Sequence, residues 1–313
     1  MHEFELIEHY FHRAGGAGVA VGIGDDGAVL DLPAERQLVA VADTLVAGVH
    51  YPDELTPADI GFRAVAVNLS DIAAMGATPA WFTLALSIPA ADATWLEGFA
   101  SGLFAAADEH DVALVGGDTT AGLQTVITVQ ALGHVARGRC LQRSGCQPGD
   151  RIYLSGTPGD AAAGLACLQN GESQPYLVQR FRRPAARVAL GASLVGIANA
   201  AIDVSDGLCA DLSHVLTASG CGATLEQERL PLSAELVAYC GEAEAARSAL
   251  AGGDDYELVF TVSEANEQRL LQATRDKGQF VTRIGVAEPE PGLRMTHNGQ
   301  QQAVPSTGYR HFA

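Results

Sequence analysis

The sequence predicts an α/β protein of two domains. Its 313 residues are enough for two domains of ordinary size. Short apolar runs that end in glycine and aspartate alternate with longer segments of helical periodicity. A cluster of turn-forming residues at 143–150 interrupts this alternation, so we place the boundary between a domain at 1–148 and a domain at 149–313.

The composition excludes several classes of partner. The net charge is −18, from 37 acidic and 19 basic residues, which argues against a nucleic acid or an anionic membrane surface. Such a chain can still bind an anionic substrate if metal cations reverse the local field. The six cysteines show no Cys-x-x-Cys spacing, so no zinc site is expected. With neither a signal peptide nor an apolar run of about 18 residues, we expect a cytoplasmic protein with reduced thiols.

The elements of the first domain follow from periodicity and end signals. Thr56, Pro57 and Asp59 form a helix start, and the helix should run to about residue 74 and stop at Gly76. Other helices are expected at 4–14 and 92–110. Strands are expected at 28–32, 37–42, 80–88, 112–115 and 125–135.

The second domain opens with a strand at 151–154 and a helix that starts near Asp160. We interpret Asp160 as a charge favoured by the helix dipole at that start. The one basic cluster, Arg180 to Arg183, could meet a phosphate, but a surface loop before a proline-started helix explains it as well.

An aspartate lies in the middle of an apolar segment at 64–76. An unpaired carboxylate is costly to bury, so Asp71 either binds a cation or lies on a solvated helix face with Asn68. Other carboxylates stand where apolar segments meet glycine: Asp26, Asp43, Asp118, Asp203, Asp206, Asp254 and Asp255. Hard oxygen ligands suit Mg²⁺, and like charges converge only with cations among them. The carboxylates are therefore either far apart or part of a magnesium–nucleotide site.

No motif for an activated nucleophile is present. The sequence has neither Gly-x-Ser-x-Gly nor a His-Arg-Asp loop, and we assign no catalytic side chain. A phosphate monoester is already mostly dianionic at pH 7 and could attack the γ-phosphoryl group of ATP without a strong base. Catalysis would then consist of positioning and charge neutralisation.

Several segments resemble the thiamine-monophosphate kinase family in order and spacing, over essentially the whole chain. The segment 68–76 is shared with the wider superfamily of aminoimidazole ribonucleotide synthetase and selenophosphate synthetase. Gly-Gly-Asp-Asp-Tyr-Glu-Leu at 252–258 and the terminal Gly-Tyr-x-x-Phe are similar to the thiamine branch. The remaining matching segments are 24–26, 43–50, 116–120 and 202–208.

This resemblance implies a fold and a reaction. The strands of the N-terminal α/β domain would form a barrel across a homodimer, with a second α/β domain beside it. ATP would phosphorylate thiamine monophosphate to thiamine diphosphate. The implied Mg²⁺ ligands are Asp26, Asp43, Asp71, Asp118, Asp203 and Asp206. The implied ATP contacts are Gly117, Asp118, Arg143 and Ser205, and the implied thiamine monophosphate contacts are His50, Asp254 and Tyr309.

The sequence departs from the family pattern in two places. Val41 and Ala42 stand where the family tends to have hydroxyl residues near metal, so only their backbone carbonyls could serve. Asp254 replaces a substrate-site glutamate and is one methylene shorter. The alternatives are another ATP-using member of the superfamily, a non-catalytic nucleotide-binding protein and an acidic scaffold.

Overall fold

The chain folds into two compact units. The computed structural model describes residues 3–13, 15–305 and 308. The first unit comprises Met1–Ile72 and Ala77–Gly138, and the second comprises Ala73–Gly76 and Arg139–Ala313. The division lies before the predicted boundary at 148/149, because the chain after Gly138 joins the second unit. There the Leu141 N–H donates to the Met75 carbonyl (3.0 Å), and Cys146 is buried in that unit's core.

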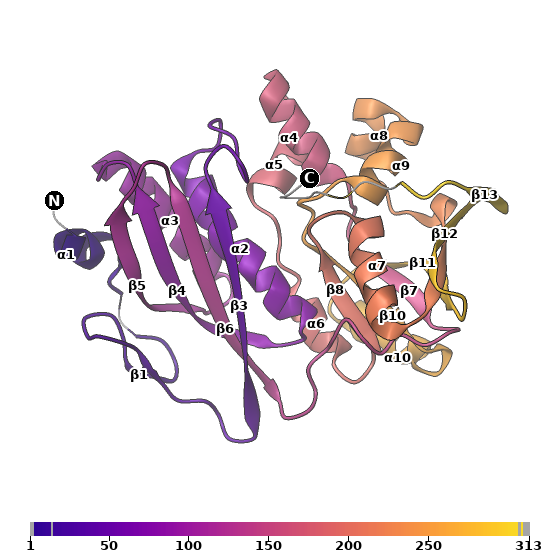
Figure 1. Cartoon of the computed structure of the whole chain (residues 1–313), viewed down its shortest axis with the longest axis horizontal. Helices are drawn as coiled ribbons and strands as arrows, with labels where there is room; N and C mark the ends of the chain where they lie inside the picture. Colours follow the sequence, from indigo (N-terminus) through magenta and orange to yellow (C-terminus); the bar gives the residue numbers. More distant parts are fainter. Residues whose placement is uncertain (1–2, 14, 306–307, 309–313) are drawn as a thin grey trace. The chain divides into compact units, whose positions relative to one another are not determined.

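A four-stranded sheet forms the centre of the first unit, and helices α2 and α3 lie on one of its faces (Figure 1). The strand order is β3-β6-β4-β5, with β4 and β5 parallel and the other neighbours antiparallel. The elements are α1 (Glu3–Leu6), the π-helix η1 (Ile7–Phe11), β1 (Val19–Val21), β2 (Val29–Leu30), β3 (Arg36–Val46), α2 (Pro57–Ala74), β4 (Thr78–Ile88), α3 (Ala93–Asp108), β5 (Ala113–Ala121) and β6 (Val126–Ala136).

Local end signals place the two long helices, and those at Thr56 were predicted. The Thr56 side chain accepts from the Asp59 N–H (3.2 Å) and donates to the Asp59 carboxylate (2.8 Å). Asp92 caps α3 by accepting from the Trp95 N–H (2.9 Å). The expected helix at 4–14 is shorter, because its helical segment ends at Phe11.

Within the described part of the first unit, helices cover one face of the sheet only. In β3, Val39 and Leu45 are buried, whereas Leu38 on the other face is 49% exposed. Val129 of β6 and Leu84 of β4, which are in register with each other, are also buried. The prediction of a buried strand at 37–42 was therefore wrong: β3 is an edge strand with alternating exposure.

Two strands run further than expected. β3 continues through Asp43 to Val46, and β5 continues through the glycines at 116–117 to Ala121. Both carboxylates, Asp43 and Asp118, thus lie inside edge strands and not at strand ends.

The second unit holds a seven-stranded sheet in the order β13-β12-β9-β11-β7-β10-β8. Its strands are β7 (Arg151–Ser155), β8 (Ala200–Val204), β9 (Gly222–Glu226), β10 (Glu257–Val262), β11 (Val281–Glu288), β12 (Gly292–His297) and β13 (Gln300–Gln302). Its helices are α4 (Asp160–Asn170), α5 (Pro175–Arg182), α6 (Val188–Leu194), α7 (Leu208–Ser219), η2 (Gln227–Arg229), α8 (Ala234–Cys240), α9 (Glu242–Ala251), η3 (Glu264–Asn266) and α10 (Glu267–Asp276). The mixed α/β class is confirmed.

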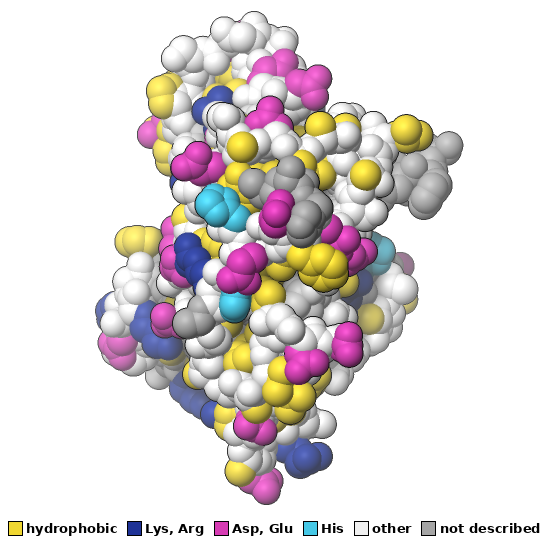
Figure 2. All heavy atoms as spheres, turned by 90° about the vertical axis from the view of Figure 1, so that its left-hand side faces the viewer, with side chains coloured by type: hydrophobic (Ala, Val, Ile, Leu, Met, Phe, Trp, Pro, Cys, Tyr) yellow, Lys and Arg dark blue, Asp and Glu magenta, His cyan; other side chains and the backbone are white. Residues whose placement is uncertain are grey.

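The surface reflects the acidic composition. Asp and Glu side chains are scattered over the face shown in Figure 2, with hydrophobic side chains exposed between them. All six cysteines are free thiols. Among the described residues, the search found no helix with the length and apolar character needed to cross a bilayer.

Candidate active site

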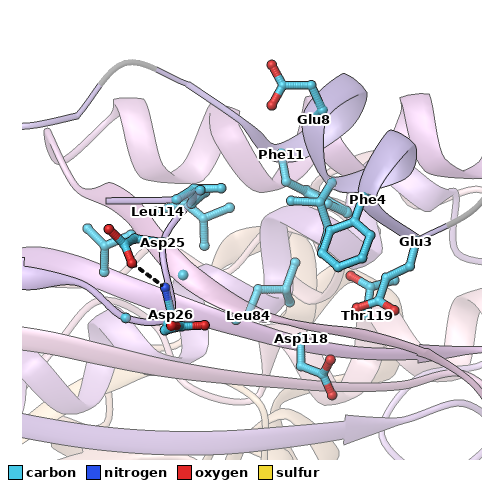
Figure 3. Close-up of a pocket in the computed structure, with 17 residues that line it drawn as sticks. Glu3, Phe4, Glu8, Phe11, Asp25, Asp26, Leu84, Leu114, Asp118 and Thr119 are labelled. Carbon is cyan, nitrogen blue, oxygen red and sulfur yellow. Dashed lines mark hydrogen bonds between the residues drawn. The ribbon is translucent and has the colours of Figure 1, made fainter. Parts of the chain in front are cut away.

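A pocket of about 750 Å³ in the first unit brings two of the predicted metal ligands together (Figure 3). Asp26 comes from the loop between β1 and β2, and Asp118 comes from β5. The Asp25 carboxylate accepts a hydrogen bond from the Asp26 N–H (2.8 Å), which fixes the turn that presents Asp26. The volume of the pocket is in the range of small-ligand sites.

The charge of this pocket is one-sided. Its described lining includes the carboxylates of Glu3, Glu8, Asp25, Asp26 and Asp118, and it includes no Lys, Arg or His. A triphosphate entering alone would be repelled by these groups. Hard cations remove that repulsion, and carboxylate oxygens are the ligands Mg²⁺ prefers, so the residues present fit this ion.

The opposite wall of the pocket is apolar. Phe4 and Phe11 of the N-terminal helical segment line the pocket together with Leu84 and Leu114 (Figure 3), and Ile7 is also part of the lining. Phe4 is 75% exposed, so its ring is available to a ligand. The sequence indicated an amphipathic helix here but not that its apolar face borders a pocket, because that depends on a contact with distant strands.

Gly117 places Asp118 by allowing two backbones to approach closely. It has φ +152°, and a Cβ at this position would lie 1.8 Å from the Leu84 carbonyl oxygen of β4. Only glycine fits such a contact.

Gly117→Ala should therefore disturb the pairing of β4 with β5 beside Asp118. We expect a loss of roughly 1–3 kcal/mol in the free energy of unfolding, as for other overpacked sites, together with reduced turnover. Thermal melts and steady-state kinetics measure both. Gly116→Ala is the matched control, because a Cβ there meets nothing within 4 Å; equal losses in the two variants would contradict this explanation.

A second group of predicted ligands lies at the β3 edge of the same sheet. The Asp43 N–H donates to Asn68 Oδ1 (3.0 Å), and the Asn68 amide donates to the Ala64 carbonyl (3.0 Å). Asn68 is fully buried, so the reading of a solvated face for this residue was wrong. Asp71 follows one turn later on α2, on the same side of the helix and partly exposed.

The two groups stand apart within one chain. Asp43 is in register with Val129, Val129 with Leu84, and Leu84 with Gly117, which spans the whole sheet. Three strand spacings of about 4.8 Å put these edges about 14 Å apart, whereas Mg²⁺ holds its oxygens at about 2.1 Å. Consistently, no three Asp, Glu, His or Cys side chains among the described residues form a group able to hold a metal.

His50 follows β3, and a hydrogen bond fixes its tautomer. The Val46 N–H donates to His50 Nδ1 (3.0 Å), so the ring proton of the neutral imidazole is on Nε2. Nε2 is then the nitrogen that could donate to a substrate oxygen.

In the second unit, Asp203 lies within β8 and is 5% exposed, and the turn that follows β8 carries Ser205 and Asp206. Asp211 Oδ2 accepts from the N–H groups of Ser205 (3.0 Å), Asp206 (3.0 Å) and Gly207 (3.1 Å), which holds the turn closed. Burial raises the pKa of Asp211 to about 7, and the charges of Asp203 and Asp206 add to the rise, while amide hydrogen bonds oppose it. The turn is therefore a concentrated negative site, where a cation is favoured.

The segment before β10 is joined to this turn. The Asp254 N–H donates to the Ser205 carbonyl and the Tyr256 N–H to the Val204 carbonyl, both at 2.8 Å. The Tyr256 hydroxyl donates to Asp254 Oδ1 (3.2 Å). The structure thus brings Asp203, Ser205, Asp206 and Asp254 together.

The last two predicted site residues, Arg143 and Tyr309, are not joined to either group by a contact described above. Arg143 is exposed in the segment that follows Gly138. Tyr309 lies outside the described residues, although Gly308 is described and lies beside the Asp206 carbonyl.

Comparisons with known proteins show the family to which the chain belongs. Residues 24–135 match the N-terminal domain, and residues 147–298 the C-terminal domain, of the AIR synthase related proteins. The chain is therefore a two-domain member of that class.

Within this class, the chain belongs to the thiamine-monophosphate kinase family. It is 47% identical to the thiamine-monophosphate kinase of Salmonella typhimurium, over 99% of this chain and 98% of the relative. The crystal structure of thiamine-monophosphate kinase from Stenotrophomonas maltophilia K279a is 43% identical, with TM-score 0.86 and 96% of each chain covered. A structure described as AaThiL complexed with AMPPCP and TMP is 33% identical, with TM-score 0.80 over 93% of this chain and 92% of that one.

Proposed function

We propose that this chain transfers the γ-phosphoryl group of ATP to thiamine monophosphate, giving ADP and thiamine diphosphate. Membership of the thiamine-monophosphate kinase family over nearly the full length carries this proposal. The relative described with AMPPCP and TMP supports the choice of co-substrate and acceptor. The acceptor phosphate supplies the nucleophile, so transfer is direct and in line.

Acidic residues in each unit would hold Mg²⁺ ions that accompany ATP. These ligands are Asp26, Asp43, Asp71, Asp118, Asp203 and Asp206. When bound, Mg²⁺ neutralises the charge of the triphosphate. Val41 and Ala42 offer only backbone carbonyls beside Asp43.

The chain's other site residues orient the two substrates. Gly117 and Asp118 would contact the triphosphate, and Arg143 and Ser205 would be further ATP contacts. His50, Asp254 and Tyr309 contact thiamine monophosphate, and His50 can donate from Nε2.

A homodimer completes the site. β3 and β5 are the two edges of the four-stranded sheet, and one face of that sheet carries no helix in the described part of the first unit. Two such sheets can close into a barrel if the β3 edge of one copy meets the β5 edge of the other. This pairing brings Asp43 and Asp71 of one chain to Asp26 and Asp118 of the partner subunit, which resolves the separation of about 14 Å within one sheet.

The apolar wall of the pocket is placed to receive the nucleobase of ATP. Phe4→Ala removes one aromatic stacking surface, which is worth about 0.5–1.5 kcal/mol, and should raise the KM for ATP by roughly three- to tenfold. The KM for thiamine monophosphate should change little. Phe280→Ala removes an equally exposed ring in the other unit and serves as the control; the same KM for ATP in both variants and wild type would count against a base at this wall.

The activity itself is tested with purified protein, ATP, Mg²⁺ and thiamine monophosphate. We expect ADP and thiamine diphosphate in equal amounts. Asp71→Asn should lose most of the turnover while its thermal melt stays unchanged, and Asp276→Asn, an exposed aspartate on α10, should keep full activity. ADP release with a different phosphate or amide substrate, and none with thiamine monophosphate, would reject the assignment. ATP binding without any turnover would favour a non-catalytic protein.

A further inference from the structure

A buried ionic network lies at the start of β10, outside the residues assigned so far. Glu257, the first residue of β10, is 0% exposed. Its carboxylate accepts from Arg180 (2.7 Å), from Arg187 Nε (2.6 Å), from a second Arg187 nitrogen and from Ser155 Oγ (2.5 Å). Glu257, Arg180, Arg187 and Ser155 are called the Glu257 network below.

The network is tied to further segments of the second unit. Arg180 Nε also lies 3.9 Å from the Asp160 carboxylate, which is 0% exposed. Asp160 accepts from Ser233 Oγ (2.5 Å) and Thr157 Oγ1 (2.5 Å). The backbone makes room for these groups at Gly156 (φ +57°), where a Cβ would lie 2.0 Å from Glu257 Oε1. β7, α5 and the residue before α6 thus meet on the Glu257 carboxylate, and α4 is joined to this group through the ion pair of Asp160 with Arg180.

A buried ion pair is weak evidence of a contribution to stability, since apolar side chains of similar volume often stabilise as well. What such a network does supply is a fixed geometry for the segments that it joins. The question is therefore which neighbouring group needs that geometry.

The neighbouring group is the substrate segment at 254–256. Asp254 and Tyr256 have φ of +70° and +53°, a conformation that residues with side chains rarely adopt and that persists only when the surroundings enforce it. Between them, Asp255 is buried and accepts from the Gly159 N–H (2.7 Å). Asp255 and Glu257 are thus held inside the unit. Tyr256 lies between these two fixed residues, and Asp254 immediately precedes the first of them.

We propose that Glu257, Arg187 and Arg180 are positioning residues that set the location of Asp254 and thereby the affinity for the cationic thiazolium ring of thiamine monophosphate. This inference rests on the proposed function, in which Asp254 contacts that substrate. The shorter side chain of aspartate has less reach than the glutamate of the family pattern, so the backbone position of residue 254 matters more here. Arg187 binds Glu257 through two nitrogens, a geometry that lysine does not reproduce.

Arg187→Lys tests the proposal, because it keeps the charge and loses the two-pronged contact. We expect the KM for thiamine monophosphate to rise about tenfold or more while the KM for ATP stays within about twofold. Arg229→Lys is the matched control, since Arg229 forms an exposed ion pair with Glu226 (2.6 Å) in the same unit. All kinetics are run well below the melting temperature of each variant, so that the protein stays folded. Any remaining loss of folded protein would lower the apparent kcat and leave the ratio of the two KM values unchanged.

A second variant, Glu257→Gln, covers the case in which Arg187→Lys does not fold. It keeps the volume and one acceptor oxygen, and should shift the same KM in the same direction. An unchanged KM for thiamine monophosphate in a folded variant, or equal changes in both KM values, overturns the positioning role while the proposed function stands. If wild type and Arg229→Lys both fail to phosphorylate thiamine monophosphate, the proposed function fails, and this inference with it.

Discussion

Mixing two inactive variants, Asp43→Asn and Asp118→Asn, is expected to restore about a quarter of the wild-type activity. Each variant alone should lose about a hundredfold or more in kcat, because a metal ligand contributes several kcal/mol of charge stabilisation. Random exchange of subunits makes half of the dimers mixed. If Asp43 of one chain works with Asp118 of the partner subunit, one of the two sites in each mixed dimer carries both substitutions and the other carries neither.

The control is a mixture of Asp43→Asn with Asp71→Asn. Both residues lie at the β3 edge of the same chain, where Asp43 is bound to Asn68 of α2, so every site in that mixture keeps one substitution and no recovery is expected. Subunit exchange is confirmed with differently tagged copies before activity is measured. A first mixture that exchanges fully and stays inactive would show that the site is assembled within one chain.

Glu257→Ala is expected to cause the largest loss of stability. It leaves Arg180 and Arg187 without their carboxylate, and breaking a buried ion pair by removing one partner typically costs about 3–5 kcal/mol. Because the Arg187 side chain retains 32% exposure, we expect the lower end of that range, about 3 kcal/mol. For a unit of this size the melting temperature should fall by roughly 6–12 °C.

The loss of stability caused by Glu257→Ala should depend on pH. Burial by itself raises the pKa of Glu257, but hydrogen bonds and charge from Arg187 and the charge of Arg180 outweigh it, so the pKa lies below the ordinary 4.5. A lowered carboxyl pKa gives stability that is complete above pH 4.5 and is lost as the pH falls through the folded value. Thermal melts between about pH 3 and about pH 7 should show the difference in melting temperature between wild type and variant becoming smaller in acid. Glu244→Ala, which removes an exposed pair with Arg247, should change little at any pH.

Local signals predicted the helices and part of the site. Neighbouring residues signal the start of α2 at Thr56 and its stop near Gly76, and the structure confirms both. The helix expected at 92–110 is also present, as α3 (Ala93–Asp108). Glycine turns also signalled Asp26 and Asp118, which line one pocket.

Pairings between distant segments could not be predicted in the same way. Strand order decides that β3 and β5 are opposite edges, and no local pattern encodes that order. The basic cluster was interpreted as a surface loop or a phosphate contact, but Arg180 is on α5 and pairs with Glu257, a residue far along the chain. Asp160 does begin a helix, yet its burial depends on Ser233 and Thr157 as well as on the dipole.

The two sheet edges, β3 and β5, have a consequence for the aggregation of newly folded chains. Unpaired edge strands are templates for indiscriminate association, and β3 and β5 are the two edges of the four-stranded sheet in the described part of the first unit. The charge of −18 counters this hazard, because like-charged chains repel one another at a distance and only a well-matched docking overcomes the repulsion. The strong negative charge thus limits aggregation of the chains. High salt screens this repulsion, so it should increase aggregation of dilute, freshly refolded protein.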